Sequence, residues 1–536
     1  MTNRIGRSSM LLASGTIVSR VLGFVSAVVL ARTVGLIGSG ADAFALANQL
    51  PNNVYAIVAG GVLSAVFVPQ IVNAQLHKDG GEKYINRLLT LGMSVVLVVT
   101  IAAVAAAPFL VRLYTQHTTD GGGHGFGPEE LALATAFAWW CLPQVFFYAA
   151  YSLVGEVLNA KGVFGPFTWS PALNNVVAIA GMLWFGQFFT GSVSVAADWD
   201  ATEVAILAGT ATFGVVVQAL ALFGFLRRAS IRFRPDFRFR GVGLGTTTKL
   251  AAWTFGMIVV TQLAGIVQSN IASLATGYGE PGLAVLRFGW LVFMLPHSVI
   301  TVSLGTAYFT RMSTDVRDKR WDRLGSDIRE SLSRISLFMV ISAGVLWLTA
   351  TYVASVFAGE AANGMANVIT LFAVGLVPFG IVFVLQRIFY ALEDTRTPFF
   401  IQLAQSAIFV GGALIAGAGP VSNIANGIAL SMSISTYIQA VAMVIFIRRR
   451  LGRLGGKAMG SAFARYIIAL VPAIGVGFIV REVFPSTPTS IPLAILLAVV
   501  IASAMGAVYL SVLLLLRDTS AHDVVAPLRR RRNKRP

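Results

Sequence analysis

Apolar runs long enough to cross a lipid bilayer recur along almost the whole chain. Of its 536 residues, 56% are hydrophobic and only 12% are charged, whereas a soluble domain carries about 25% charged residues. A helix needs about 20 mostly apolar residues to span the hydrocarbon core, and about fourteen runs of that length are present. Strands of a membrane β-barrel would be shorter and would alternate in polarity, unlike these runs. The sequence therefore predicts an all-α polytopic membrane protein.

The charges of the connections predict how the chain is threaded through the membrane. Roughly 34 of the 40 Lys and Arg residues fall in alternate connections that would share one side. The positive-inside rule places that side, and with it both termini, in the cytoplasm. Such an arrangement requires an even number of spans, in agreement with fourteen. The expected spans are centred on residues 10–32, 42–74, 87–113, 129–158, 168–190, 203–226, 247–277, 283–310, 331–357, 364–392, 398–417, 423–447, 461–481 and 490–516.

Two basic segments admit a second interpretation besides topology. Residues 232–240 read RFRPDFRFR, and their alternation of Arg with Phe suits an element that lies on the membrane surface. The tail at 529–536 could bind anionic lipid headgroups. Plain topology signalling explains both segments and is the simpler interpretation. It also accounts for the net charge of +17, which would suggest a nucleic-acid partner only in a soluble protein.

Two segments far apart in the chain share a pattern that indicates an internal duplication. LPNNVYAIVAGG begins at Leu50 and LPHSVITVSLGT begins at Leu295, and both place a Val and a Gly at the same distances after the Pro. Both lie in even-numbered spans, so the repeat is parallel, as in transporters built from two rocking lobes. The expected organisation is a six-span N-lobe at 1–230, a six-span C-lobe at 231–455, a further span pair at 456–518 and a basic tail at 519–536.

No motif of a soluble catalytic centre is present. The sequence lacks a GxxxxGK[ST] nucleotide loop, a Cys/His cluster with metal-ligand spacing, and the GxSxG and HExxH motifs. The single cysteine, Cys141, excludes an internal disulfide. A membrane-embedded enzyme acting on polyprenyl-linked sugars would need grouped acids on a roomy outer loop, and the outward acids here sit on short loops. A transporter without cofactor or metal is therefore favoured over an enzyme.

Polar side chains inside the apolar runs indicate a chamber within the membrane. The first two expected spans carry Arg20, Arg32, Asp42 and Asn52. A charge at bilayer depth costs about 2.5–3.5 kcal/mol on insertion scales and usually faces a cavity or a partner. We therefore expect these four side chains to line one wall of the chamber. Arg287, in the eighth span, either faces the chamber or is a snorkelling anchor near the end of its span.

Several short motifs carry a resemblance to a known family. They are Ser19–Phe24 (SRVLGF), Ala31–Arg32, Ala41–Phe44 (ADAF), Leu50–Asn52 (LPN), Phe67–Pro69 (FVP) and Phe389–Pro398 (FYALEDTRTP). These motifs resemble the MurJ (MviN) family, the lipid II flippases of the multidrug/oligosaccharidyl-lipid/polysaccharide exporter superfamily. The resemblance extends over essentially the whole chain, including the added span pair at its end.

The resemblance implies a fold and a substrate. Two lobes would form a V around a cationic cavity, and the last two spans would form a groove for a lipid tail. The substrate would be undecaprenyl-pyrophosphoryl disaccharide-pentapeptide (lipid II), moved from the cytoplasmic to the outer leaflet of the bacterial cytoplasmic membrane by alternating access. Membrane lipids and the cell-wall synthesis machinery would be further partners.

The resemblance also assigns residues. Arg20 resembles the family's pyrophosphate-binding arginine and Asp42 its acidic partner, while Arg32 and Asn52 match further family positions. Arg287 lies one helical turn before an expected arginine, on the same face, and would substitute for it.

The cavity expected here is less charged than that of the family's prototypes. Ser26 and Tyr55 stand where the prototypes carry arginines, and Trp290, Leu291 and Met294 stand where they carry an acid–arginine pair and a glutamate. The carboxylates proposed to hold sodium in some members are also missing. These departures leave open an exporter of another polyprenyl-linked glycan, or of a drug, from the same superfamily.

Overall fold

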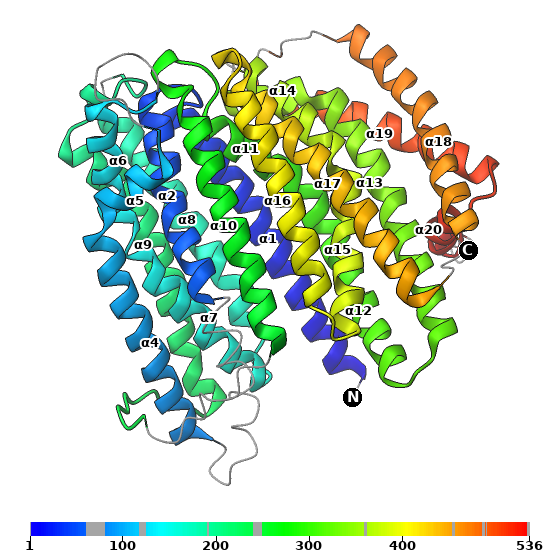
Figure 1. Ribbon diagram of the computed structural model, residues 1–536, viewed down its shortest axis with the longest axis horizontal. Helices are drawn as coiled ribbons and strands as arrows, with labels where there is room; N and C mark the ends of the chain where they lie inside the picture. The colour runs from blue at the N-terminus through cyan, green and yellow to red at the C-terminus, as the bar shows by residue number, and fades with distance from the viewer. Residues whose placement is uncertain are drawn as a thin grey trace. The chain divides into compact units, whose positions relative to one another are not determined.

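The all-α membrane fold predicted from the sequence is confirmed by a computed structural model of the protein (Figure 1). The structure describes residues 2–59, 81–116, 125–189, 192–239, 249–358, 362–452, 456–484, 488 and 490–532. Within these ranges the chain forms helices joined by short connections and contains no strand.

Most of the expected spans meet the length and composition that a membrane requires. Eleven helical segments of the described chain do so individually. A twelfth span consists of α14 (Ala362–Val374) and α15 (Leu376–Ala391), which are bent by 46° at the residue between them. The predicted count of fourteen is therefore approximate, and the two remaining spans are the second and the fifth.

These two expected spans are described to different extents. The second is represented by α2 (Ser39–Val58), and the rest of the run predicted to end at residue 74 lies outside the described residues. The fifth is α8 (Gly165–Phe188), a helix of sufficient length that carries polar side chains on two faces. The Asn175 Nδ2 donates to the Ser19 carbonyl of α1 at 3.0 Å, and Asn174 lies against Gly214 of α9. Packing between helices therefore shields the polar groups of α8.

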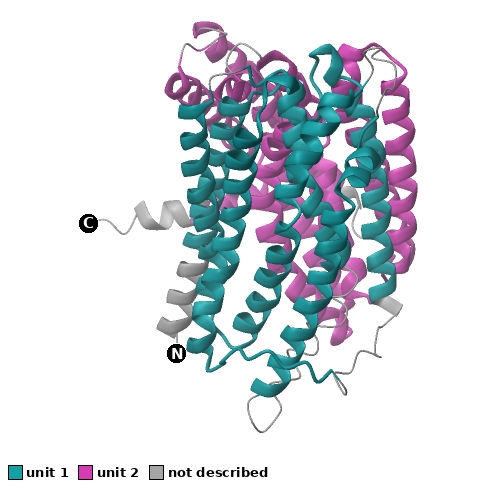
Figure 2. Ribbon diagram, turned by 90° about the vertical axis from the view of Figure 1, so that its left-hand side faces the viewer, with its two compact units in different colours: residues 1–284 teal, residues 285–536 magenta. Residues whose placement is uncertain are grey.

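The chain divides into two compact units, residues 1–284 and 285–536, which Figure 2 colours teal and magenta. In the first unit α8 packs against both α1 and α9, and α2 packs against α6 and α10. The helices of this unit are α1 (Thr2–Val34), α2, α4 (Glu82–Ala105), α5 (Ala107–Tyr114), α6 (Pro128–Cys141), α7 (Gln144–Ala160), α8, α9 (Ala201–Leu226) and α10 (Lys249–Ser273), with short turns η2 (Ala196–Asp198), η3 (Arg227–Ala229) and η4 (Thr276–Tyr278).

The second unit is organised around the long helix α13, which packs against α14, α15, α18 and α19. Its core includes Tyr352, Tyr466 and Tyr509, all nearly inaccessible to solvent, and the Tyr509 hydroxyl donates to the Leu337 carbonyl at 3.0 Å. The helices are α11 (Leu283–Pro296), the π-helical turn η5 (His297–Thr301), α12 (Val302–Arg317), α13 (Trp321–Ala358), α14, α15, α16 (Arg396–Gly417), η7 (Val421–Asn423), α17 (Ile424–Leu451), α18 (Gly456–Val483), α19 (Ile491–Leu515) and α20 (Thr519–Arg532).

A close approach of α8 to α9 depends on Gly181, and it yields a stability prediction. A Cβ at this position would overlap the Thr210 side chain of α9. We expect Gly181→Val to lower the free energy of unfolding by about 1–3 kcal/mol, because overpacking forces the helices apart. The measurement is thermal unfolding of the purified protein in detergent.

A matched control lies on the same helix. Gly186 is exposed, and a Cβ there would meet nothing within 4 Å. Gly186→Val therefore makes the same chemical change without the overlap. Equal destabilisation by both variants would contradict a packing role for Gly181.

Candidate functional site

Arg20 places a cation inside the first span. The candidate membrane span within α1 runs from Ser14 to Val34. Arg20 lies about 9 Å along the helix axis from Ser14. Its side chain is half-buried, and none of the ion pairs found among the described residues involves it. A guanidinium at this depth, without a carboxylate partner in the described chain, is suited to an anionic ligand.

The turn of α1 that carries Arg20 is fixed by α8. The Ser19 carbonyl accepts the hydrogen bond from Asn175, and Gly23, one turn later, lies beside the same amide. Asn175 therefore positions this part of α1 and is absent from the predicted site. The signal in the sequence is a pair of neighbouring asparagines in the middle of an apolar run.

Arg32 does not lie beside Arg20. At 1.5 Å per residue, the two arginines are separated by about 18 Å along α1. The Arg32 side chain is exposed and belongs to the last turn of the helix, where a cation is favoured by the helix dipole. The two guanidinium groups are therefore too far apart to hold one pyrophosphate together in this conformation.

Asp42 is buried in the first turn of α2, at 1% exposure. Thr276 Oγ1 donates to its Oδ2 at 2.6 Å, and the backbone N–H of Ala284 donates to its Oδ1 at 2.7 Å. Gly282 leaves the space that the carboxylate fills, since a Cβ there would overlap it. The carboxylate thus ties the start of α2 to the connection after α10. Its predicted pairing with Arg20 is not among the ion pairs of the described residues.

Asn52 is exposed on α2, about 15 Å along the helix axis from Asp42. The next residue, Asn53, is buried and forms a hydrogen bond with the Tyr114 side chain. The Asn53 amide is thus used for a contact inside the unit, whereas the Asn52 amide is not buried. The exposed amide of Asn52 is in a position to meet a ligand.

Arg287 belongs to α11 in the second unit, and its side chain is half-buried. One turn later, Trp290 stacks on Phe293 with ring centroids 4.9 Å apart, and both rings contact Phe372 and Phe379. Aromatic packing therefore occupies the part of α11 where the resemblance would place an acid–arginine pair. Arg287 is the cation that α11 retains.

Arg387 of α15 is a further cation within a span, and the predicted site does not include it. Its guanidinium lies over the Phe383 ring, 3.4 Å from the centroid, and Nη1 donates to the Phe383 carbonyl at 3.4 Å. A cation–π contact of this kind stabilises a desolvated guanidinium. The described residues of its unit supply no carboxylate to it.

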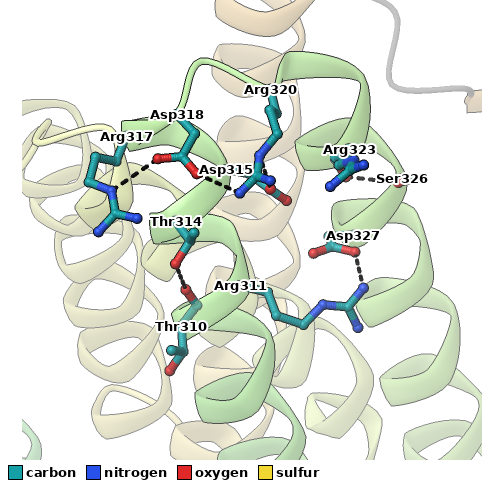
Figure 3. Close-up of polar contacts among 10 residues, drawn as sticks. All are labelled: Thr310, Arg311, Thr314, Asp315, Arg317, Asp318, Arg320, Arg323, Ser326 and Asp327. Atoms are coloured by element: carbon teal, nitrogen blue, oxygen red, sulfur yellow. Dashed lines mark hydrogen bonds and ion pairs between the residues drawn. The ribbon is translucent and has the colours of Figure 1, made fainter.

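Three arginines close to the connection between α12 and α13, Arg311, Arg317 and Arg320, are instead paired with neighbouring acids (Figure 3). Arg311 Nη2 lies 2.6 Å from Asp327 Oδ1, and Arg320 contacts both Asp315 at 3.2 Å and Asp318 at 2.6 Å. These pairs neutralise Arg311 and Arg320 without a ligand. Among the described residues, no group of three or more His, Cys, Asp or Glu side chains could hold a metal ion.

Comparison with protein families identifies relatives over most of the chain. A family model described as lipid II flippase MurJ matches residues 30–503. A probable lipid II flippase MurJ of Haemophilus influenzae is 26% identical over 447 residues, covering 79% of this chain and 83% of the relative. A protein of the same description from Thermotoga maritima is 25% identical over 426 residues, covering 78% and 81%.

Solved structures show the same fold. A lipid II flippase MurJ in an inward closed conformation matches with a TM-score of 0.71 at 19% identity, covering 94% of this chain and all of that one. An inward-facing multidrug transporter of the MATE family and MOP superfamily matches with a TM-score of 0.63 at 15% identity, covering 83% of this chain and 98% of that one.

Proposed function

The chain belongs to the MurJ family of lipid II flippases, which are transporters rather than enzymes, and from that premise we propose that it carries lipid II from the cytoplasmic to the outer leaflet of the bacterial cytoplasmic membrane. A sugar–peptide headgroup cannot cross hydrocarbon unaided, whereas an isoprenoid tail can remain in the lipid. The protein would therefore enclose the headgroup and expose it to each side in turn.

The cation Arg20 is the observation that carries the binding part of this proposal. Its guanidinium is half-buried within the first span and has no carboxylate partner among the described residues. A pyrophosphate presents paired oxygens that a planar guanidinium matches in a bidentate manner. Arg32, Asn52 and Arg287 would contact other parts of the headgroup during transport. Asp42 would support the site by holding the start of α2 in place.

The proposal also includes the location of both termini and the roles of the two lobes and the last two spans. The basic connections support a cytoplasmic location for both termini. The lobes at 1–230 and 231–455 would rock about the site, and the spans α18 and α19 would offer a groove to the isoprenoid tail. Cell-wall synthesis proteins would receive the delivered lipid II.

A second candidate, an exporter of another polyprenyl-linked glycan or a drug, draws on the aromatic packing around Trp290. The family membership does not favour it.

Depletion of the protein in its host separates the two candidates. We expect lipid II to accumulate in the inner leaflet, because its headgroup cannot cross the hydrocarbon unaided, and the measurement is the fraction of lipid II accessible from outside. Re-expression of the intact chain is the control and should restore that fraction. Unchanged outward delivery, together with altered drug sensitivity, would favour the drug exporter instead.

A further inference from the structure

A pocket of about 880 Å³ opens at one end of the first unit. It lies at the start of α4, at Glu82, and at the end of the span that α9 and η3 form together, at Ala229. Its position therefore corresponds to the boundary between hydrocarbon and water. The lining residues are Glu82, Phe223, Leu226, Arg227, Ser230, Ile231, Arg232, Phe233 and Arg234.

The wall formed by residues 230–239 is fixed to α4 by hydrogen bonds. The Asn86 amide donates to the Arg232 carbonyl at 2.9 Å, and the Arg232 N–H donates to the Glu82 carboxylate at 3.0 Å. Further along, the Asp236 N–H donates to Thr90 Oγ1 at 3.0 Å. Ile231 is buried in the core of the unit at 1% exposure. The segment is thus an ordered part of the unit, because hydrogen bonds and the buried Ile231 hold it in place.

Alternation along this extended segment separates apolar from cationic side chains. Ile231 and Phe233 point toward the core, where Phe233 packs edge-on against Phe223 with centroids 5.7 Å apart. Arg232 and Arg234, which alternate with them along the extended chain, are exposed and line the same pocket. The pocket therefore combines an aromatic floor with a cationic rim.

The three arginines of the rim outnumber the single carboxylate of the lining, Glu82, which accepts a hydrogen bond from the Arg232 backbone N–H. Arg227, Arg232 and Arg234 take part in none of the ion pairs of the described residues. The nearby carboxylate of Asp236 is occupied by Arg238 at 3.0 Å and Arg87 at 3.6 Å. Hydrogen bonding to Arg238 holds the pKa of Asp236 below its ordinary value, so this carboxylate stays ionised and engaged. The arginines of the pocket therefore differ from Arg311 and Arg320 in Figure 3, which form ion pairs with neighbouring aspartates.

We propose that this pocket binds the phosphate-bearing headgroup of an anionic phospholipid. Guanidinium groups bind phosphate oxygens in a bidentate manner, and a pocket of this volume is large enough for a headgroup. Phe237, 69% exposed and followed by Arg238, suits the interfacial layer in which lipid phosphates lie. The inference rests on the pocket itself and goes beyond the transport of lipid II.

Retention of phosphatidylglycerol by the full-length protein tests the proposal. Purified protein is titrated with phosphatidylglycerol in a zwitterionic background, and bound lipid is counted by native mass spectrometry. We expect the triple variant R227Q/R232Q/R234Q to bind phosphatidylglycerol about tenfold or more weakly, because charge-assisted contacts to the phosphate are lost. Thermal unfolding of the variant should stay unchanged, since all three side chains are exposed.

A control with the same loss of charge keeps the test specific. R228Q/R317Q/R323Q removes three exposed arginines that do not line the pocket, and we expect its affinity to stay within about twofold of the parent protein. Equal weakening in both triple variants, or no preference for phosphatidylglycerol over phosphatidylcholine, would overturn the proposal. Displacement by millimolar inorganic phosphate would assign the pocket to a free anion, and displacement by lipid II would assign it to the transport substrate; either result would overturn the phospholipid assignment.

Discussion

Replacing Asp42 with alanine is expected to lower the free energy of unfolding by about 3 kcal/mol, within the range for removing one partner of a buried charged network. The change leaves the Thr276 hydroxyl and the Ala284 N–H without their acceptor in a site that excludes water. Thermal unfolding of the purified protein measures the effect. Asp42→Asn retains one acceptor oxygen and should fall between the alanine variant and the parent protein.

Gly282 offers a sharper test of the same contact. A Cβ at this position would overlap the Asp42 carboxylate, so Gly282→Ala should also destabilise the protein. The two effects should not add, because the overlap disappears once the carboxylate has been removed. Gly265→Ala is the matched control, since a Cβ there meets nothing within 4 Å. Full additivity of Asp42→Ala and Gly282→Ala would show that the carboxylate does not fill the space next to Gly282.

The distances along the chain show why sequence could not predict this role of Asp42. Its partners lie 234 and 242 residues away, and no periodicity in a helix reports contacts of that kind. The resemblance to a family assigned Asp42 to Arg20 instead. That pairing stays a prediction for another conformation of the protein, since the described residues place the carboxylate elsewhere.

The membrane spans were predictable because length and hydropathy are local properties. Of the two exceptions, α8 is the one that the structure describes over its whole expected length. Its Asn174 and Asn175 lower the hydropathy of the helix, and their shielding depends on contacts with α9 and α1 that come from distant parts of the chain. The sequence also could not distinguish a surface-lying segment at 232–240 from one held against α4. The bonds to Asn86 and Thr90 show that this segment is held against α4, and its position on the membrane surface stays a prediction.

The candidate site was predictable in its residue types more than in its geometry. An arginine in an apolar run indicates a ligand because the cost of burying the charge is a local property. The separation of Arg20 from Arg32 also follows from the helix repeat. The position of Arg387 over an aromatic ring depends on side-chain conformations within α15, and a span carrying a lone arginine near its end does not reveal them.

Substitution of Arg20 by alanine is expected to weaken lipid II binding by roughly 100-fold, corresponding to about 3 kcal/mol for a desolvated charge pair. The purified protein is titrated with lipid II and, separately, with an undecaprenyl carrier that bears another glycan. Arg20→Lys retains the charge but not the bidentate fork, so it should recover only part of the affinity. Arg228→Ala removes an equal charge at the end of another span, where the guanidinium lies over the Phe225 ring, and serves as the control.

Selective binding of lipid II that is lost in Arg20→Ala, with unchanged thermal unfolding, would support both the substrate and the pyrophosphate contact. Equal binding of the two carriers would leave the family assignment intact and contradict the substrate assignment. Unaltered affinity in Arg20→Ala would place the pyrophosphate elsewhere. The half-buried Arg387 would then be the next cation to replace. Like Arg20, it lies within a span, and the described residues of its unit supply no carboxylate to it.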